Sequence, residues 1–179
     1  MATDVITLIT NDHRTVESLF ERLKKGQGDL SATVAELHAL LTAHARAEED
    51  RVYPGIDAHH GVEEHKEAEV LLDSLVRAKP GTAEFAEALD KLAESVDHHV
   101  QEEETTLLPK LARTASEAKL RELGQAFKER RAEELRALTA TGDGPTKAEL
   151  YEQAQKADIP GRSQMDKDEL QQALRQAKS

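Results

Sequence analysis

The sequence predicts an all-α protein: an antiparallel up-down-up-down four-helix bundle with a fifth helix and a small C-terminal helix-loop-helix. Aromatic residues make up only 3% of the 179 residues, and charged residues make up 33%. Strands favour aromatic and β-branched residues, so this composition is typical of helices. Apolar residues also recur at helical spacing in five stretches before residue 140. Long amphipathic helices joined by short connections favour an antiparallel bundle.

The first two helices are bounded by clear stop signals. The first is predicted over about residues 4–25 and ends at the glycine-rich Gly26-Gln27-Gly28. The second is predicted to begin near a Ser31 cap and to run to about residue 53, where Pro54-Gly55 breaks it. These boundaries give two long helices with a short connection.

Three more helices follow before residue 140. The third is predicted over about 62–78, ahead of Pro80-Gly81, and the fourth over about 82–108, ahead of Pro109. A fifth, over about 116–138, carries apolar residues on one face and is expected to dock on the outside of the bundle.

A second, smaller unit is predicted at the C-terminal end. The small, polar and glycine-containing residues 141–145 are typical of a flexible linker, so residues 1–140 form the bundle unit. Within 146–179, Thr146–Glu149 and Asp166–Glu169 each resemble a capping box that opens a short helix. This pattern predicts a helix-loop-helix.

Composition and charge exclude several classes of protein. The absence of Cys excludes disulfides and thiolate metal sites, and no apolar run approaches the roughly 20 residues of a membrane span. The polar start lacks the pattern of a signal peptide, so we expect a cytoplasmic protein. We also expect a monomer without a membrane partner. The net charge of −11 argues against general binding to nucleic acids or anionic membranes.

Histidines occupy the apolar stripes of four predicted helices, and three are followed by Glu four residues later. On the second helix, the stripe of Val34, Leu37 and Leu41 continues through His44 and Glu48. A spacing of four residues places both side chains on one face, one turn apart. The candidate metal ligands are His13, His44, Glu48, His65, Glu69, His99 and Glu103.

The three carboxylates in these stripes need compensating charge if they are buried. On the third helix, for example, His65 and Glu69 are expected to share the core face with Leu72 and Val76. An unpaired buried carboxylate costs several kcal/mol. No Lys or Arg lies in the stripes near the His–Glu pairs, so a metal is the expected source of positive charge. A purely structural bundle without metal would have to accommodate three buried Glu.

The other four histidines lie off the stripes and are not expected to bind metal. His38 lies at a stripe edge, and His59 and His60 are expected in the loop after the second helix. His98 with Glu102 repeats the His–Glu spacing, but it points about 100° away from the stripe and is expected to face solvent.

The ligand types narrow the choice of metal. Imidazole and carboxylate without thiolate suit iron, manganese, zinc or copper. Seven candidate ligands exceed the four of a structural zinc site and suggest a two-metal centre. Two iron ions are the first choice.

The arrangement of motifs resembles the HHE cation-binding domain of the hemerythrin family over about residues 4–112. The resemblance rests on LITNDHRTVESLF around His13 and on the segments His44–Glu48, His65–Glu69 and His99–Glu103. It implies a non-haem di-iron centre with bridging carboxylates from Glu48 and Glu103 and with the four His as terminal ligands.

Glu69 departs from the pattern of oxygen-carrying hemerythrins, which have a His at that place. An added carboxylate favours ferric over ferrous iron, so peroxide or nitric oxide chemistry, or sensing, is expected rather than reversible oxygen carriage. An unidentified electron donor would serve an enzyme, whereas a non-enzymatic sensor of oxygen, iron or redox state, or an iron-binding module, stays open as the alternative. Tyr53, just past Glu48, is a candidate neighbour that would hydrogen-bond or bind the metal, and a packing role before Pro54 stays open as the alternative.

Residues 146–179 resemble the SAP-like and Rho-termination-factor N-terminal-like helix-loop-helix families. Some members of those families bind nucleic acid. The segment carries only Arg162 and Lys167 near its loop, so weak nucleic-acid contact, docking of a protein partner and a passive appendage all stay open.

Overall fold

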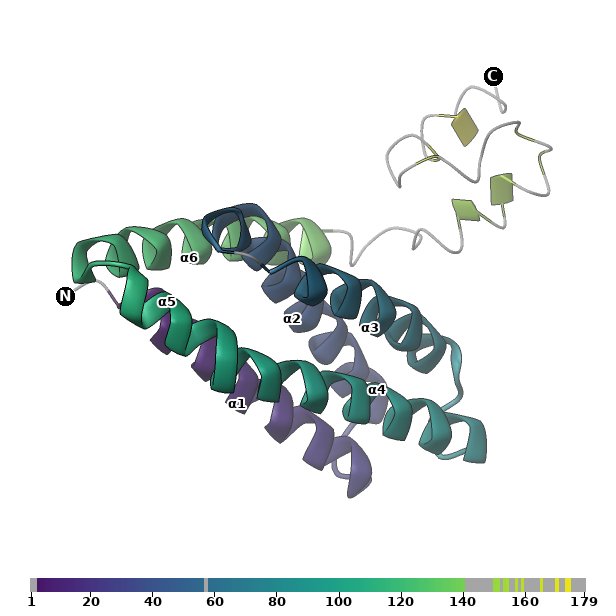
Figure 1. The fold of residues 1–179 in the computed structure, drawn as a ribbon. Helices are drawn as coiled ribbons and strands as arrows, with labels where there is room; N and C mark the ends of the chain where they lie inside the picture. Colours follow the sequence, from purple (N-terminus) through teal and green to yellow (C-terminus); the bar gives the residue numbers. More distant parts are fainter. Residues whose placement is uncertain are drawn as a thin grey trace. The chain divides into compact units, whose positions relative to one another are not determined.

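Four helices form a closed bundle (Figure 1). The computed structural model describes residues 3–56, residues 58–140 and scattered positions between 150 and 174. The bundle consists of α1 (Val5–Lys24), α2 (Leu30–Arg51), α3 (His59–Arg77) and α4 (Ala83–Glu102). Each helix packs on its neighbours in the chain and α1 packs on α4, which closes the bundle. No strand occurs in the described residues, as the composition predicted.

Side-chain caps fix the starts of three bundle helices. Asp4, Asp29 and Thr82 accept hydrogen bonds from the backbone N–H groups of Thr7, Ala32 and Phe85. These bonds satisfy donors that have no partner within the helix. The predicted Ser31 cap is wrong, because the carboxylate of Asp29 caps α2 and Ser31 lies inside the first turn.

The connection between α2 and α3 is shorter than predicted. A single 3₁₀ turn, η1 (Tyr53–Gly55), contains the Pro-Gly break, and α3 begins at His59. His59 and His60 therefore lie in the first turn of α3 rather than in a loop, which corrects the prediction. Because one turn completes the chain reversal, the helix can begin about three residues early.

The fourth predicted helix continues beyond Pro109. A π-helical turn, η2 (Glu103–Leu107), joins α4 to α5 (Leu108–Thr114). Pro109 lies in the first turn of α5, where its missing N–H is tolerated. The predicted end at residue 108 is therefore wrong, since the wide π turn restarts the helix instead of ending it.

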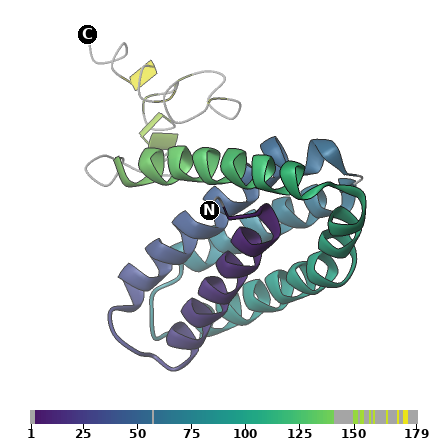
Figure 2. The ribbon, with the colours of Figure 1, turned by 90° about the vertical axis from the view of Figure 1, so that its left-hand side faces the viewer.

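The helix α6 (Glu117–Ala140) packs across the bundle at the start of α1 and beside α2 (Figure 2). Phe127 is 1% exposed and packs in a cluster with Val5 and Ile9. Gly124 approaches the backbone of Thr3 and Asp4 so closely that a Cβ atom would overlap it.

Two apolar clusters fill the bundle and leave a polar layer between them. The first apolar cluster includes Phe20, Leu37, Leu75 and Leu92. The second apolar cluster lies at the other end and includes Val5, Ile9, Leu107, Leu111 and Phe127. Along α1, α2 and α4, histidines fall between the members of the two clusters. The polar layer is therefore enclosed by apolar packing on both sides.

The chain divides into two compact units, Met1–Arg136 and Ala137–Ser179. In the second unit, Leu150, Ala154, Ile159, Leu170 and Leu174 form a small buried cluster. The predicted linker at 141–145 and the capping boxes at 146–149 and 166–169 lie outside the described residues. Among the described residues, no helix has the length and apolarity that crossing a membrane requires.

Candidate metal centre

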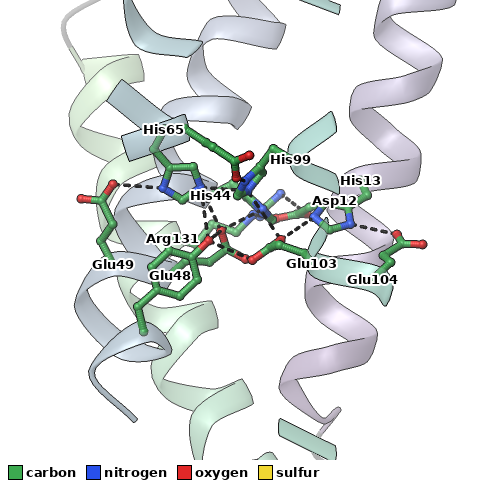
Figure 3. Close-up of polar contacts among 12 residues, drawn as sticks. Asp12, His13, His44, Glu48, Glu49, His65, His99, Glu103, Glu104 and Arg131 are labelled. Atoms are coloured by element: carbon green, nitrogen blue, oxygen red, sulfur yellow. Dashed lines mark hydrogen bonds and ion pairs between the residues drawn. The ribbon is translucent and has the colours of Figure 1, made fainter. Parts of the chain in front are cut away.

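Six of the seven predicted ligands meet in the polar layer of the bundle (Figure 3). Their side chains are at most 10% exposed. They come from α1, α2, α3, α4 and the first position of the π turn. This inner cluster consists of His13, His44, Glu48, His65, His99 and Glu103.

Each buried carboxylate of the inner cluster lies between histidines of two helices. Glu48 Oε2 is 3.3 Å from His44 Nε2 and 3.4 Å from His65 Nε2. Glu103 Oε2 is 3.2 Å from His13 Nε2 and 3.7 Å from His99 Nε2. The potential ligand atoms form two compact groups that share Glu48: His13, His44, Glu48 and Glu103 form one, and Glu48, His65 and His99 form the other.

The outer nitrogen of every inner-cluster histidine contacts a further carboxylate. Asp12 contacts His44 Nδ1 at 3.2 Å, and Glu49 contacts His65 Nδ1 at 3.0 Å. Glu64 and Glu104 contact the Nδ1 atoms of the remaining two, at 2.8 and 2.9 Å. We call Asp12, Glu49, Glu64 and Glu104 the outer carboxylates. A carboxylate at Nδ1 favours a proton there and turns the Nε2 lone pair inward, which is the tautomer that a metal ligand needs.

The outer carboxylates follow a circular order around the bundle. Asp12 on α1 supports the histidine of α2, Glu49 on α2 supports that of α3, and Glu64 on α3 supports that of α4. Glu104, in the π turn after α4, closes the circle by supporting His13 on α1. Each helix thereby orients a ligand carried by the next one.

Several inward-facing atoms of the inner cluster lack partners. His65 Nε2 and His99 Nε2 are 3.0 Å apart. With both Nδ1 atoms donating outward, two lone pairs would face each other unless a proton or a metal ion separates them. His13 Nε2, His44 Nε2, Glu48 Oε1 and Glu103 Oε2 are buried and have no hydrogen-bond partner among the described residues. A donor set of this kind fits a cation with nitrogen and oxygen ligands.

The electrostatics of the inner cluster favour positive charge. Burial alone would lower the pKa of His65, but hydrogen bonds to Glu48 and Glu49 outweigh it and raise the pKa to about 9. The pKa of His13 is also raised, because its contacts with Glu103 and Glu104 outweigh burial. Burial would raise the pKa of Glu103, but the close contact with His13 and nearby histidine charges hold that pKa below its ordinary value.

Tyr53 lies directly against the inner cluster. Its hydroxyl donates to Glu103 Oε1 at 2.9 Å and lies 3.4 Å from Glu48 Oε2. Its ring stacks on His65 with a centroid distance of 5.5 Å. Burial and the charges of both carboxylates raise the pKa of Tyr53 far above its ordinary value, so the phenol stays protonated and acts as a donor.

Glu69, the seventh predicted ligand, lies outside both groups of ligand atoms. Its side chain is exposed. The core face of α3 follows Ala68, Leu72 and Leu75, whereas Val76 is 47% exposed, so the prediction that Val76 shares the core face is wrong. The buried face is rotated by part of a turn from the predicted stripe, and Glu69 falls on its edge.

A cavity of about 150 Å³ adjoins the inner cluster on the side of the first apolar cluster. Its floor includes His13, His44, His65 and His99, and its walls include Leu41, Leu72, Val96 and Val100. Glu69 lines it together with Arg46, Glu49 and Lys66 from α2 and α3. The cavity therefore joins the histidine floor to polar residues between these two helices.

Sequence reasoning missed the outer carboxylates, although a signal was present. Each one is the immediate chain neighbour of an inner-cluster residue: Asp12 precedes His13, Glu64 precedes His65, Glu49 follows Glu48 and Glu104 follows Glu103. Neighbouring residues in a helix point about 100° apart, so the neighbour of an inner-cluster residue can contact a histidine on the adjacent helix. Of the histidines excluded earlier, His38 and His98 belong to no group of potential ligand atoms among the described residues, and His60 forms a separate surface group with Glu64 and Glu102.

Comparison with known proteins agrees with this geometry. The profile of the hemerythrin HHE cation-binding domain matches residues 4–111. A DNA nickase of Nostoc sp. (strain PCC 7120) is 28% identical over 130 residues, which are 68% of this chain but only 37% of the nickase. An uncharacterized hemerythrin-like protein of Schizosaccharomyces pombe is 28% identical over 137 residues, which are 70% of this chain and 68% of that protein. No solved structure matches. Because the profile covers more than half of the chain and every residue of the inner cluster, the chain belongs to the hemerythrin HHE cation-binding family.

Proposed function

We propose that the inner cluster holds two iron ions and that the protein binds or turns over a small ligand there: oxygen, peroxide or nitric oxide. The observation that carries this proposal is the set of four histidines whose Nε2 atoms converge on two shared carboxylates. One ion would lie among His13, His44, Glu48 and Glu103, and the other among Glu48, His65 and His99. Bound iron supplies a redox centre with an exchangeable position for the small ligand.

The surroundings of the inner cluster support a small ligand. The cavity of about 150 Å³ has apolar walls and a histidine floor. Since one water molecule occupies roughly 30 Å³ in the liquid, the cavity has room for a few such molecules. Tyr53 keeps its proton and holds Glu103 in place. Arg46 and Lys66 line the same cavity, which offers an approach for anionic forms of the ligand.

Two modes of action fit this centre. In the first, the protein is a peroxide- or nitric-oxide-consuming oxidoreductase that draws electrons from a separate donor and defends the cytoplasm against oxidative or nitrosative stress. In the second, it is a sensor of oxygen, iron or redox state, in which metal occupancy changes the stability of the bundle. The second unit, residues 137–179, would then contact a protein or, weakly, a nucleic acid, with the chain acting as a monomer.

Resemblance to a DNA nickase suggests DNA as a substrate, but the inner cluster does not favour it. The chain spans only 37% of that relative. Its net charge of −11 repels DNA, and the inner cluster is enclosed by apolar clusters on both sides. We expect any nicking of supercoiled plasmid by the purified protein to be unchanged by His44→Ala.

Metal analysis tests the proposed centre. Protein purified under iron-replete conditions should carry two irons per chain, and His44→Ala or His99→Ala should lower that number. His38→Ala is the matched control, because His38 is a partly buried histidine of α2 that belongs to no group of ligand atoms. Fewer than two irons in the unaltered protein, or equal iron in all three variants, contradicts the proposal.

Optical spectra then separate the two modes of action. Spectra are recorded after dithionite, oxygen, peroxide and nitric oxide are added to the iron-loaded protein. Continued loss of peroxide or nitric oxide over many turnovers supports the enzyme. A stoichiometric, reversible spectral change supports the sensor. No change with any ligand overturns the proposal of a small ligand at the metal.

A further inference from the structure

A second group of potential metal ligands lies at the surface, where the start of α3 faces the end of α4. This surface cluster consists of His60, Glu64 and Glu102, and its three ligand atoms lie within 4.8 Å of one another. His60 Nε2 is 3.6 Å from Glu64 Oε1 and 3.6 Å from Glu102 Oε2. His98 Nε2, from the next turn of α4, is also 3.6 Å from Glu64 Oε1. Two helices therefore direct nitrogen and oxygen donors at one point.

Glu64 brings to this cluster a buried carboxylate oxygen that has no partner to compensate it. Its side chain is 11% exposed, and its Oε1 atom is buried without a hydrogen-bond partner among the described residues. Its other oxygen accepts from His99 Nδ1 at 2.8 Å. Within the described part of the chain, neither Glu64 nor Glu102 forms an ion pair with Lys or Arg. A buried, charged oxygen without a partner is costly, and a cation beside it removes that cost.

The spacing of these atoms suits a metal better than direct hydrogen bonds. Hydrogen bonds between nitrogen and oxygen span about 2.7–3.2 Å, so three contacts of 3.6 Å are too long. Zinc binds His nitrogen and carboxylate oxygen at about 2.0–2.2 Å in a tetrahedron, which places its ligands about 3.4 Å apart. The two separations from His60 Nε2 match that value to within a few tenths of an ångström.

We propose that the surface cluster binds one divalent transition-metal ion, with His60, Glu64 and Glu102 as ligands. His98, whose side chain is 72% exposed and free to turn, or a water molecule completes the tetrahedron. Imidazole and carboxylate donors select zinc, ferrous iron or a similar ion rather than calcium or magnesium, which prefer oxygen ligands alone.

Glu64 would link the surface cluster to the inner cluster. One carboxylate oxygen faces His60 and the other holds His99. A cation on the first oxygen withdraws charge from the second, which weakens the hydrogen bond to His99 and makes that histidine a poorer donor. A metal ion bound at the surface cluster would thus change the donor strength of His99 in the inner cluster without any movement of a helix.

Zinc binding by the full-length protein tests this site. Iron-loaded protein, freed of loose metal, is dialysed against increasing Zn²⁺, and bound zinc and iron are measured together. We expect one zinc per chain beyond the iron, with affinity lowered at least tenfold by His60→Ala or Glu102→Gln. Glu67→Gln is the matched control, since it removes one exposed carboxylate from α3 outside the cluster. Equal zinc binding by the unaltered protein and His60→Ala overturns the proposal.

Co²⁺ provides a second readout that does not depend on iron. In the unaltered protein, Co²⁺ at the surface cluster should give tetrahedral visible absorption that His60→Ala removes while its helical circular dichroism stays unchanged. The difference of one metal between the unaltered protein and His60→Ala should persist when the inner cluster carries no iron. Loss of that difference contradicts the surface site alone, whereas low iron in both proteins contradicts the proposed iron centre alone.

Discussion

At the scale of single residues, the outer carboxylates decide which nitrogen of each histidine is available. All four contact Nδ1, so all four Nε2 atoms face inward. Imidazole has two similar nitrogens, and without such support each ring could also turn its other nitrogen or hold its proton inside. The circular order makes this support depend on every pair of adjacent helices. The orientation of the four histidines therefore depends on how the helices of the bundle pack against one another.

Asp12 allows this support to be tested. Asp12 contacts His44 Nδ1 and also pairs with Arg131 of α6 through Nε at 2.6 Å and Nη2 at 2.8 Å. We expect Asp12→Asn to lower iron affinity about 10–100-fold, as for other carboxylates that orient metal-binding histidines. Competition with a chelator of known affinity measures the change.

Arg131→Gln is the control for this prediction. It removes the same ion pair with Asp12 but leaves the contact between Asp12 and His44. If both variants lose iron affinity equally, docking of α6 rather than orientation of His44 is responsible.

Tyr53 is predicted to tune the centre without holding the metal. Tyr53→Phe removes the hydrogen bond to Glu103 and keeps the stacked ring. We expect iron to stay bound and the free energy of unfolding to fall by about 1–3 kcal/mol. Glu103, relieved of a donor, then gives more charge to the metal and favours ferric iron, which lowers the reduction potential.

Mediated redox titration and denaturant unfolding measure the two effects of Tyr53→Phe. Tyr151→Phe, at an exposed position of the second unit, is the matched control and should change neither. Loss of iron in Tyr53→Phe would instead mean that the phenol oxygen is a ligand.

At the scale of elements, the fold is more predictable than the site. Apolar periodicity located five helical stretches, because burying one face of each helix leaves a repeat in the sequence. Periodicity did not identify which face of α3 is buried, because the buried face contains several small or polar residues. Val76 and Glu69 were therefore assigned to the core, although both are exposed. Contacts such as Glu64 with His99 join different helices, so the position of Glu64 beside His65 in the chain marks it as a candidate but does not identify its partner.

The π turn is a second feature that helical periodicity does not predict. Glu103 and Glu104 contact opposite nitrogens of the same ring, Nε2 and Nδ1 of His13. Neighbours in a regular helix point about 100° apart. The wide turn at Glu103–Leu107 contains both and still leads into α5, which buries Leu108 and Leu111. Turns of this kind occur at functional sites, and the sequence offers no simple signal for them.

The docking of α6 depends on the small size of one residue. A Cβ atom at position 124 would overlap the backbone at Thr3, which cannot yield as a flexible side chain can. Gly124→Ala would otherwise raise helix propensity by about 1 kcal/mol. We expect it instead to destabilise the protein by about 1–3 kcal/mol through overpacking.

Thermal and denaturant unfolding measure this change in Gly124→Ala. Gln125→Ala, at the adjacent exposed position of α6, serves as the control and should be close to neutral. An unchanged or higher stability in Gly124→Ala would show that α6 is not held against the start of α1.

At the scale of the whole molecule, the bundle contains two carboxylates that need positive charge at its centre. Glu48 and Glu103 are at most 1% exposed, and apolar clusters lie on both sides. Protons on the histidines or metal ions can supply this charge. The stability of the metal-free protein should therefore depend on pH in a way that bound metal removes.

The expected sign follows from His65, whose pKa in the folded, metal-free protein is raised from 6.5 to about 9. A raised pKa stabilises the fold fully below pH 6.5. That stabilisation is lost as the pH rises through 9, by about 3 kcal/mol at most. In iron-loaded protein His65 carries no proton at Nε2, so this loss should be absent. Urea unfolding of both forms at several pH values tests the prediction, and metal-free His65→Gln should lose less stability over the same range. If the metal-free protein instead becomes more stable as the pH rises over this range, protonated His65 does not supply the positive charge that Glu48 and Glu103 need.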